Sequence, residues 1–127
     1  NIRAYQQTLF NCLNYIDGTN LKVDEDPIPH DRLQTLTPSD LMRWFNFKTF
    51  GVENPPFAQH GHNAIPPVFV RANSILCWKK QISFFMVNNH HAWNEITNAG
   101  NPTRSRELLQ LVKYVKKKEV RHQGNPS

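Results

Sequence analysis

The residues of this chain that could do chemistry are the basic side chains of its last third, in the stretch GNPTRSRELLQLVKYVKKKEVRHQG (residues 100–124). Arg106, Lys113 and Lys117 are spaced by seven and four residues, so on a helix they share one side, here called the basic face. With Arg121 beside it, the face extends over about four turns, or ~20 Å. Cations at this density can neutralise several phosphates, and a helix fits the major groove of DNA.

Two interpretations of the basic face stay open. A helix surface that is merely solvated usually mixes charges of both signs at i and i+4, whereas Glu107 and Glu119 fall on other sides of the wheel. This favours a polyanion-binding face. The helix dipole alone could account for basic residues late in a helix, including Lys116 at the margin of the face.

Two neighbouring segments could add contacts. GNPTRS (residues 100–105) offers hydroxyl and guanidinium groups beside the free N–H groups of a first helical turn, which suits a phosphate, although an ordinary helix cap has the same pattern. VRANSILCWKK (residues 70–80) carries basic groups at its start and on its narrow polar strip, and these groups could reach DNA. The alternative is that they are ordinary solvent-exposed residues on a core helix. The full set of predicted DNA contacts is Arg71, Lys79, Lys80, Thr103, Arg104, Arg106, Lys113, Lys116, Lys117 and Arg121.

The distribution of charge along the chain supports a polyanion-binding face. The chain has 127 residues, which suits one domain with a real core, and a net charge of +5. Residues 1–70 carry five basic and seven acidic groups, whereas residues 71–127 carry ten basic and three acidic groups. Such asymmetry points to nucleic acid or another polyanion as the partner.

The periodicity of apolar residues predicts four main helices and no strand. We expect helices at about 3–17, at 38–51 after the N-cap Thr37, at 70–87, and at about 103–122 with Asn101 or Thr103 as its cap. The third helix is apolar on most sides and should be the most buried. Residues 18–36, 52–69 and 88–101 are expected to be connections, the last with a short turn near Trp93, whose ring packs on the core. The prediction is a single all-α bundle.

Other chemistry finds little support. Six histidines lack helical zinc spacing, no paired cysteines accompany them, and no nucleophile, zinc-protease or nucleotide-binding motif occurs, so we expect no metal, no cofactor and no activity of this chain by itself. Cys12 and Cys77 lie in apolar patterns and are expected in the core, in a reducing intracellular compartment. No apolar run approaches the ~20 residues of a membrane span. The chain begins with Asn1, and we expect it to be a piece of a longer protein.

Four segments, in order, carry a resemblance to a known family: Y…LFNCLNYI, LTPSDLMRWFNFKTFG, RANSILCWKKQISFFM and GNPTRS…LLQLVKYVKKK. Together they resemble the N-terminal core-binding domain of tyrosine recombinases of the phage-integrase type. Within that family, they are most similar to the Crypton-like recombinases of eukaryotic mobile elements. The resemblance covers most of the chain. The connection at 52–69 is longer than in a typical bacterial member, and the catalytic Arg, His-x-x-Arg and Tyr of the family are not found here.

The resemblance implies a SAM-like helical fold that helps to clamp double-stranded DNA for site-specific recombination or transposition. Cutting and rejoining would belong to a separate C-terminal catalytic domain, and other protomers would assemble on the DNA. It also implies a nuclear location and DNA contacts from the third and fourth helices. The alternative is a helical protein-interaction module whose basic helix docks an acidic partner.

Overall fold

In the part of the chain that the structure describes, the helices pack without any sheet between them. The computed structural model describes residues 1–55 and 66–123, with side chains placed as far as Glu119 in the last helix. Within these residues no strand forms, and the only β-type pairings are two isolated bridges, Ala92 with Asn101 and Asn94 with Ala99. The all-α prediction is confirmed. The elements are α1 (Ile2–Asp17), α2 (His30–Thr35), α3 (Pro38–Phe50), α4 (Ala72–Ser83), the 3₁₀ turn η1 (Pro102–Arg104) and α5 (Arg106–Gln123).

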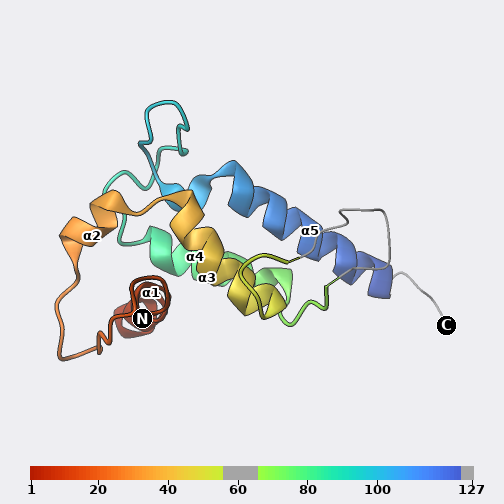
Figure 1. Cartoon of the computed structure of the whole chain (residues 1–127), viewed down its shortest axis with the longest axis horizontal. Helices are drawn as coiled ribbons and strands as arrows, with labels where there is room; N and C mark the ends of the chain where they lie inside the picture. Colours follow the sequence, from red (N-terminus) through yellow and green to blue (C-terminus); the bar gives the residue numbers. More distant parts are fainter. Residues whose placement is uncertain (56–65, 124–127) are drawn as a thin grey trace.

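One apolar core joins these helices. α1 packs against α3 and α4, and α5 packs against the same two helices. In Figure 1, α5 runs from the upper middle of the molecule to its right-hand end with α3 and α4 beneath it, and α1 is seen end-on at the lower left. The core takes its largest side chains from α1 and α3, among them Phe10 and Phe45. The apolar stripe predicted for the last helix is buried as expected: Leu108, Leu111, Val112 and Val115.

The start and end signals of α3 form as the sequence predicts. The Thr37 hydroxyl accepts a hydrogen bond from the Asp40 amide, the Asp40 carboxylate accepts one from the Thr37 amide, and Pro38 occupies the first turn. This reciprocal cap satisfies two amides that have no partner within the helix. Gly51 ends the helix at φ 80°, a backbone conformation that glycine adopts without strain.

The segment predicted as a long loop at 18–36 contains a helix, α2, that the prediction missed. Leu33 and Leu36 are buried in the core. The Arg32 guanidinium donates to Asp17 at 2.8 Å and to Asp40 at 3.3 Å, which ties α2 to the end of α1 and the start of α3. Its six residues owe their helical form to these tertiary contacts, because so short a helix is not stable alone.

The third predicted helix is shorter and more exposed than expected. α4 ends at Ser83, and Ala72, Ile75 and Ile82 are its buried residues. Cys77, expected in the core, is exposed. Phe84 is half-exposed and meets Tyr5 edge-on at the surface. The prediction that this is the most buried helix is wrong, because α1, α3 and α5 cover only part of its circumference and the rest faces solvent.

The last helix begins later than predicted. Residues 102–104 form the separate turn η1, and the hydroxyl of Ser105 accepts from the Leu108 amide at the start of α5. Trp93 does form part of the turn region at 88–101, but it is half-buried beside a cavity of about 320 Å³ lined also by Leu36 and Met86. The indole therefore does not enter the core as expected.

Asn101 is fully buried and uses its whole side chain in hydrogen bonds. Its amide nitrogen Nδ2 donates to Ser83 Oγ at 2.8 Å and to the Asn89 carbonyl at 3.1 Å. Its oxygen Oδ1 accepts from the Thr103 amide at 3.0 Å and from the Thr103 hydroxyl at 2.8 Å. The end of α4, the loop after it and the turn before α5 are thus held at one point.

Replacing Asn101 by Ala should lower the free energy of unfolding by about 3 kcal/mol, because buried donors and acceptors lose their partners. Urea denaturation measures the change. Asn20→Ala, in the exposed loop after α1, is the matched control and should change stability by less than about 0.5 kcal/mol. Equal stability of the two variants would contradict the role given to Asn101.

Candidate nucleic-acid interface

The basic face of α5 points away from the core. Arg106, Lys113 and Lys117 are all exposed, opposite the buried stripe, and Lys116 is exposed at the margin. Lys118, on the other margin, is half-buried, with Nζ 5.6 Å from the centroid of the Tyr114 ring. The helix thus gathers the predicted cations on one solvent-facing side. The side chain of Arg121 lies outside the described residues.

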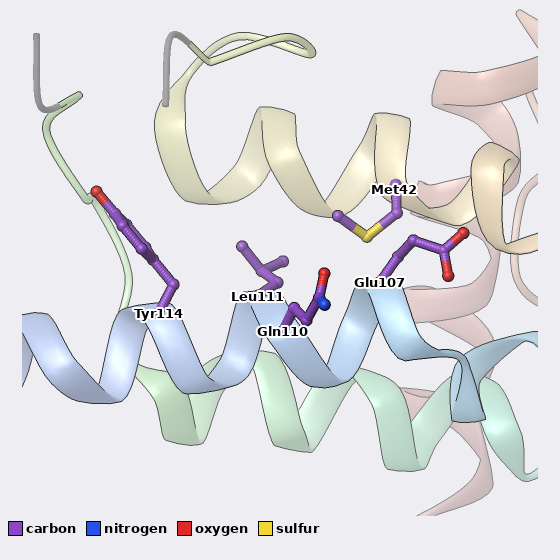
Figure 2. A pocket seen from close by; sticks show the side chains of 5 residues that line it. All are labelled: Met42, Glu107, Gln110, Leu111 and Tyr114. Atoms are coloured by element: carbon purple, nitrogen blue, oxygen red, sulfur yellow. The ribbon is translucent and has the colours of Figure 1, made fainter. Parts of the chain in front are cut away.

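The acidic residues of α5 are held away from this face. The Glu119 carboxylate accepts from the amide of Ala72 at 2.7 Å and so caps the start of α4, where Arg71 provides no side-chain cap. Carboxylates are favoured at that positive end of a helix. Glu107 is half-buried on the side of α5 that faces Met42 (Figure 2). Within the side chains that the structure describes, neither carboxylate forms an ion pair with a cation of the basic face.

Ion pairing follows the same division of the chain. In residues 1–55 and 66–119, for which side chains are described, every ion pair joins groups between Arg3 and Glu53: Arg3 with Asp24, Arg32 with Asp17 and Asp40, and Arg43 with Glu53. The cations of α4, η1 and α5 have no carboxylate partner within that range. Their charge is therefore directed to solvent or to an external anion.

A second group of cations lies where α5 begins. Arg104 is exposed, and its guanidinium donates to the carbonyl of His90, which fixes its base on the preceding loop. Lys79 of α4 is half-buried. Its pKa is lowered from the ordinary value, first by burial and then by repulsion from Arg104. Arg104 is thus within electrostatic range of the Lys79 ammonium, and an anion that bound near both would relieve the repulsion.

The structure corrects one predicted contact and locates two others. Thr103 is 1% exposed and its hydroxyl donates to Asn101, so it cannot contact DNA. The Ser105 hydroxyl is likewise engaged, at the start of α5. The hydroxyls of GNPTRS therefore serve the fold. Lys80 is exposed on α4, and Arg71 is exposed at its beginning.

A groove between α3 and α5 was not predicted from the sequence. It has a volume of about 300 Å³ and is lined by Met42, Leu111 and Tyr114, with Glu107 and Gln110 on its α5 side (Figure 2). One carboxylate oxygen of Glu107, Oε1, is buried without a hydrogen-bond partner. The only sequence signal for this groove is that Leu111 and Tyr114 lie at one edge of the apolar stripe of α5. At such an edge, the neighbouring helix either covers the apolar side chains or leaves a groove beside them.

Two other properties bear on function. Within the described part of the chain, no three His, Cys, Asp or Glu side chains come together in a set that could hold a metal ion. In the same residues, no helix combines the length and the apolar character that a bilayer crossing requires.

Comparisons with known proteins give no match: no family model, no curated protein and no solved structure is similar to this chain. The resemblance to the core-binding domain of tyrosine recombinases therefore stays a prediction from the four sequence segments.

Replacing Lys79 by Met should stabilise the fold at neutral pH, because it removes a half-buried charge repelled by Arg104 while keeping a side chain of similar length. Since the pKa of Lys79 is lowered in the folded state, its proton costs stability below that pKa. The cost disappears as pH rises through the lowered pKa towards 10.5, the ordinary value.

Urea denaturation of wild type and Lys79→Met, at neutral pH and near pH 10.5, tests this sign. The variant should be the more stable protein at neutral pH, and the difference should shrink at high pH. Lys80→Met, at an exposed neighbouring position, is the control and should show little difference at either pH. A Lys79→Met variant less stable than wild type at neutral pH would argue against an unneutralised pair.

Proposed function

We propose that this chain is a double-stranded DNA-binding domain that holds the duplex through the basic face of α5. The observation that carries the proposal is the separation of charge on that helix. Arg106, Lys113 and Lys117 are exposed together, while Glu107 and Glu119 are turned to α3 and α4. A surface helix without a polyanion partner gains nothing from such separation, because mixed charges at i and i+4 would stabilise it.

The dimensions of the face suit a duplex. From Arg106 to Lys117 it extends about 17 Å at 1.5 Å per residue, a length over which a duplex carries about ten phosphates. The major groove is ≈ 12 Å wide and admits a helix, so cations on the outer side of α5 would approach the backbones on both edges of the groove. Lys116 and the Lys79–Arg104 pair would extend these contacts at the margin and at the start of the helix. Contacts of this kind hold the phosphate backbone and carry no sequence information by themselves.

On the recombinase resemblance, we propose further that the domain clamps DNA for a separate catalytic domain during recombination or transposition in the nucleus. The support is the order of the four motif segments and their occurrence in an all-α bundle. The second of them, LTPSDLMRWFNFKTFG, forms α3 with its capped start. Reading the parent gene for a downstream Arg, His-x-x-Arg and Tyr tests this part independently of DNA binding.

A protein-interaction module remains the second candidate, and one observation favours it. The groove lined by Met42, Leu111 and Tyr114 lies beside the basic face on the same helix. An acidic peptide with one apolar side chain could fill the groove and pair with the lysines. Such binding would depend on the groove, whereas phosphate binding would not, so Met42→Ala discriminates between the two.

Binding to a duplex of random sequence, measured by fluorescence anisotropy, should weaken steeply with salt. With four or five phosphate contacts, the affinity should fall by roughly 10² between about 50 and about 200 mM salt, because bound counterions are released on association. Affinity that does not change with salt would contradict the proposal.

The double variant Lys113→Glu/Lys117→Glu should abolish measurable binding. The matched control is Arg3→Glu/Lys22→Glu, which changes the net charge equally at exposed positions on α1 and the loop after it. This control should keep most of the affinity, since loss of the exposed Arg3–Asp24 pair costs little stability. Equal loss in both double variants would mean that net charge alone, and no particular face, governs binding.

A further inference from the structure

Ile96 is an isoleucine that the fold leaves almost entirely in water. It is 93% exposed, the largest fraction among the exposed large apolar side chains of the described residues. It stands at the tip of the loop of residues 94–99, here called the tip loop. In Figure 1 the segment between α4 and α5 projects above the bundle beside the start of α5. An apolar side chain presented in this way gains free energy from any partner that removes it from water.

The tip loop has a defined backbone. The amide of Asn94 donates to the Ala99 carbonyl at 2.8 Å, and the Ala99 amide donates back at 3.4 Å. The Asn94 side chain accepts from the amides of Ile96 at 2.8 Å and Thr97 at 3.1 Å. These bonds hold Ile96 outward, so its exposure is a property of the turn and requires no disorder.

The base of the tip loop is joined to the cations at the start of α5. The Trp93 amide donates to the Arg104 carbonyl at 3.3 Å, and the Arg104 guanidinium donates to the His90 carbonyl. Gly100 has φ 111°, and a Cβ at this position would lie 2.4 Å from the Ala92 carbonyl oxygen, so only glycine lets the two sides of the loop approach so closely. The loop and α5 therefore present their outer surfaces as one unit.

We propose that the tip loop contacts the same duplex as α5 and places Ile96 in the minor groove as an apolar wedge. This inference rests on the proposed function. The face of α5 opposite α3 and α4 and the projecting loop lie on the same side in Figure 1, so a duplex against one is within reach of the other. The minor groove is ≈ 6 Å wide, too narrow for a helix but open to a tight turn, and isoleucine is among the side chains that wedge base steps apart.

The surroundings of Ile96 favour DNA over a protein partner. Thr97 and Asn98 beside it are exposed polar side chains that can bond to base edges or sugars. Arg104, bonded to the base of the loop, can hold a phosphate that flanks a widened groove. One group opposes the contact: Glu95, the acidic residue of the tip loop, is exposed and would repel phosphates. Removing its charge should therefore strengthen binding.

The test is a duplex carrying a fluorescent donor and acceptor at its two ends, titrated with wild type, Ile96→Ser, Glu95→Gln and the control Ile2→Ser. Ile2 is exposed at the start of α1, a helix that packs on the opposite side of α3 and α4 from α5 (Figure 1). Wild type should bend the duplex and raise energy transfer, since wedge insertion kinks DNA by ~20–90°.

Ile96→Ser should bind about tenfold more weakly and lose the bend. Its salt dependence should equal that of wild type, because no phosphate contact is lost. Glu95→Gln should bind more tightly than wild type, and Ile2→Ser should behave as wild type.

The outcomes separate this inference from the proposed function. If wild type binds and bends the duplex and Ile96→Ser matches it in both, the wedge is wrong while DNA binding by α5 stands. If wild type does not bind the duplex, the proposed function fails. Self-association that Ile96→Ser abolishes, at unchanged duplex affinity, would assign the tip loop to a protein contact and overturn the wedge. Thermal unfolding of Ile96→Ser should match wild type, since the side chain makes no core contact.

Discussion

The hydrogen bonds of the Asn101 side chain are the constraint on which the candidate interface depends. They join Ser83 at the end of α4, Asn89 in the following loop and Thr103 in the turn η1. Because α5 starts immediately after that turn, this buried contact fixes where α5 begins relative to α4, and the packing of its apolar stripe on α3 and α4 fixes the rest of its course. The tip loop is anchored there too, since the backbone N–H of Asn101 donates to the His91 carbonyl at 2.9 Å. One buried, uncharged residue thus links the tip loop to the start of α5 through its side chain and its backbone.

The charged groups of the two halves of the chain also have different roles. In the first half, Arg32 and Arg43 are paired with carboxylates and serve to join α1, α2 and α3. In the second half, the carboxylate that could neutralise α5 is used at the start of α4, through the Ala72–Glu119 contact. Lys79 is half-buried, and burial together with repulsion from Arg104 lowers its pKa. Such unneutralised cations are expected where an external anion completes the site.

Sequence reasoning succeeded where periodicity and caps agree and failed where tertiary contacts decide. The solvent-facing side of α5 could be predicted because burial of Leu108 and Val115 determines which residues lie on the opposite side of the helix. α2 could not, because its six residues show no full period and depend on Arg32 reaching Asp17 and Asp40. Thr103 has a residue type that suits phosphate, but its burial depends on Asn101, whose partners are distant in sequence. The tip loop lacked any sequence signal, since an isoleucine in a polar loop suggests packing as readily as exposure.

The most direct measurement of the central claim is a two-dimensional NMR titration of the ¹⁵N-labelled chain with a short DNA duplex at low salt. Binding through α5 predicts that amide signals of Arg104, Arg106, Lys113, Lys116 and Lys117 shift most. Signals of α1 and of the loop after it should remain in place, since α1 lies on the opposite side of α3 and α4 from α5 (Figure 1). An unchanged spectrum with excess duplex, or shifts confined to the groove around Met42 and Tyr114, would contradict the account.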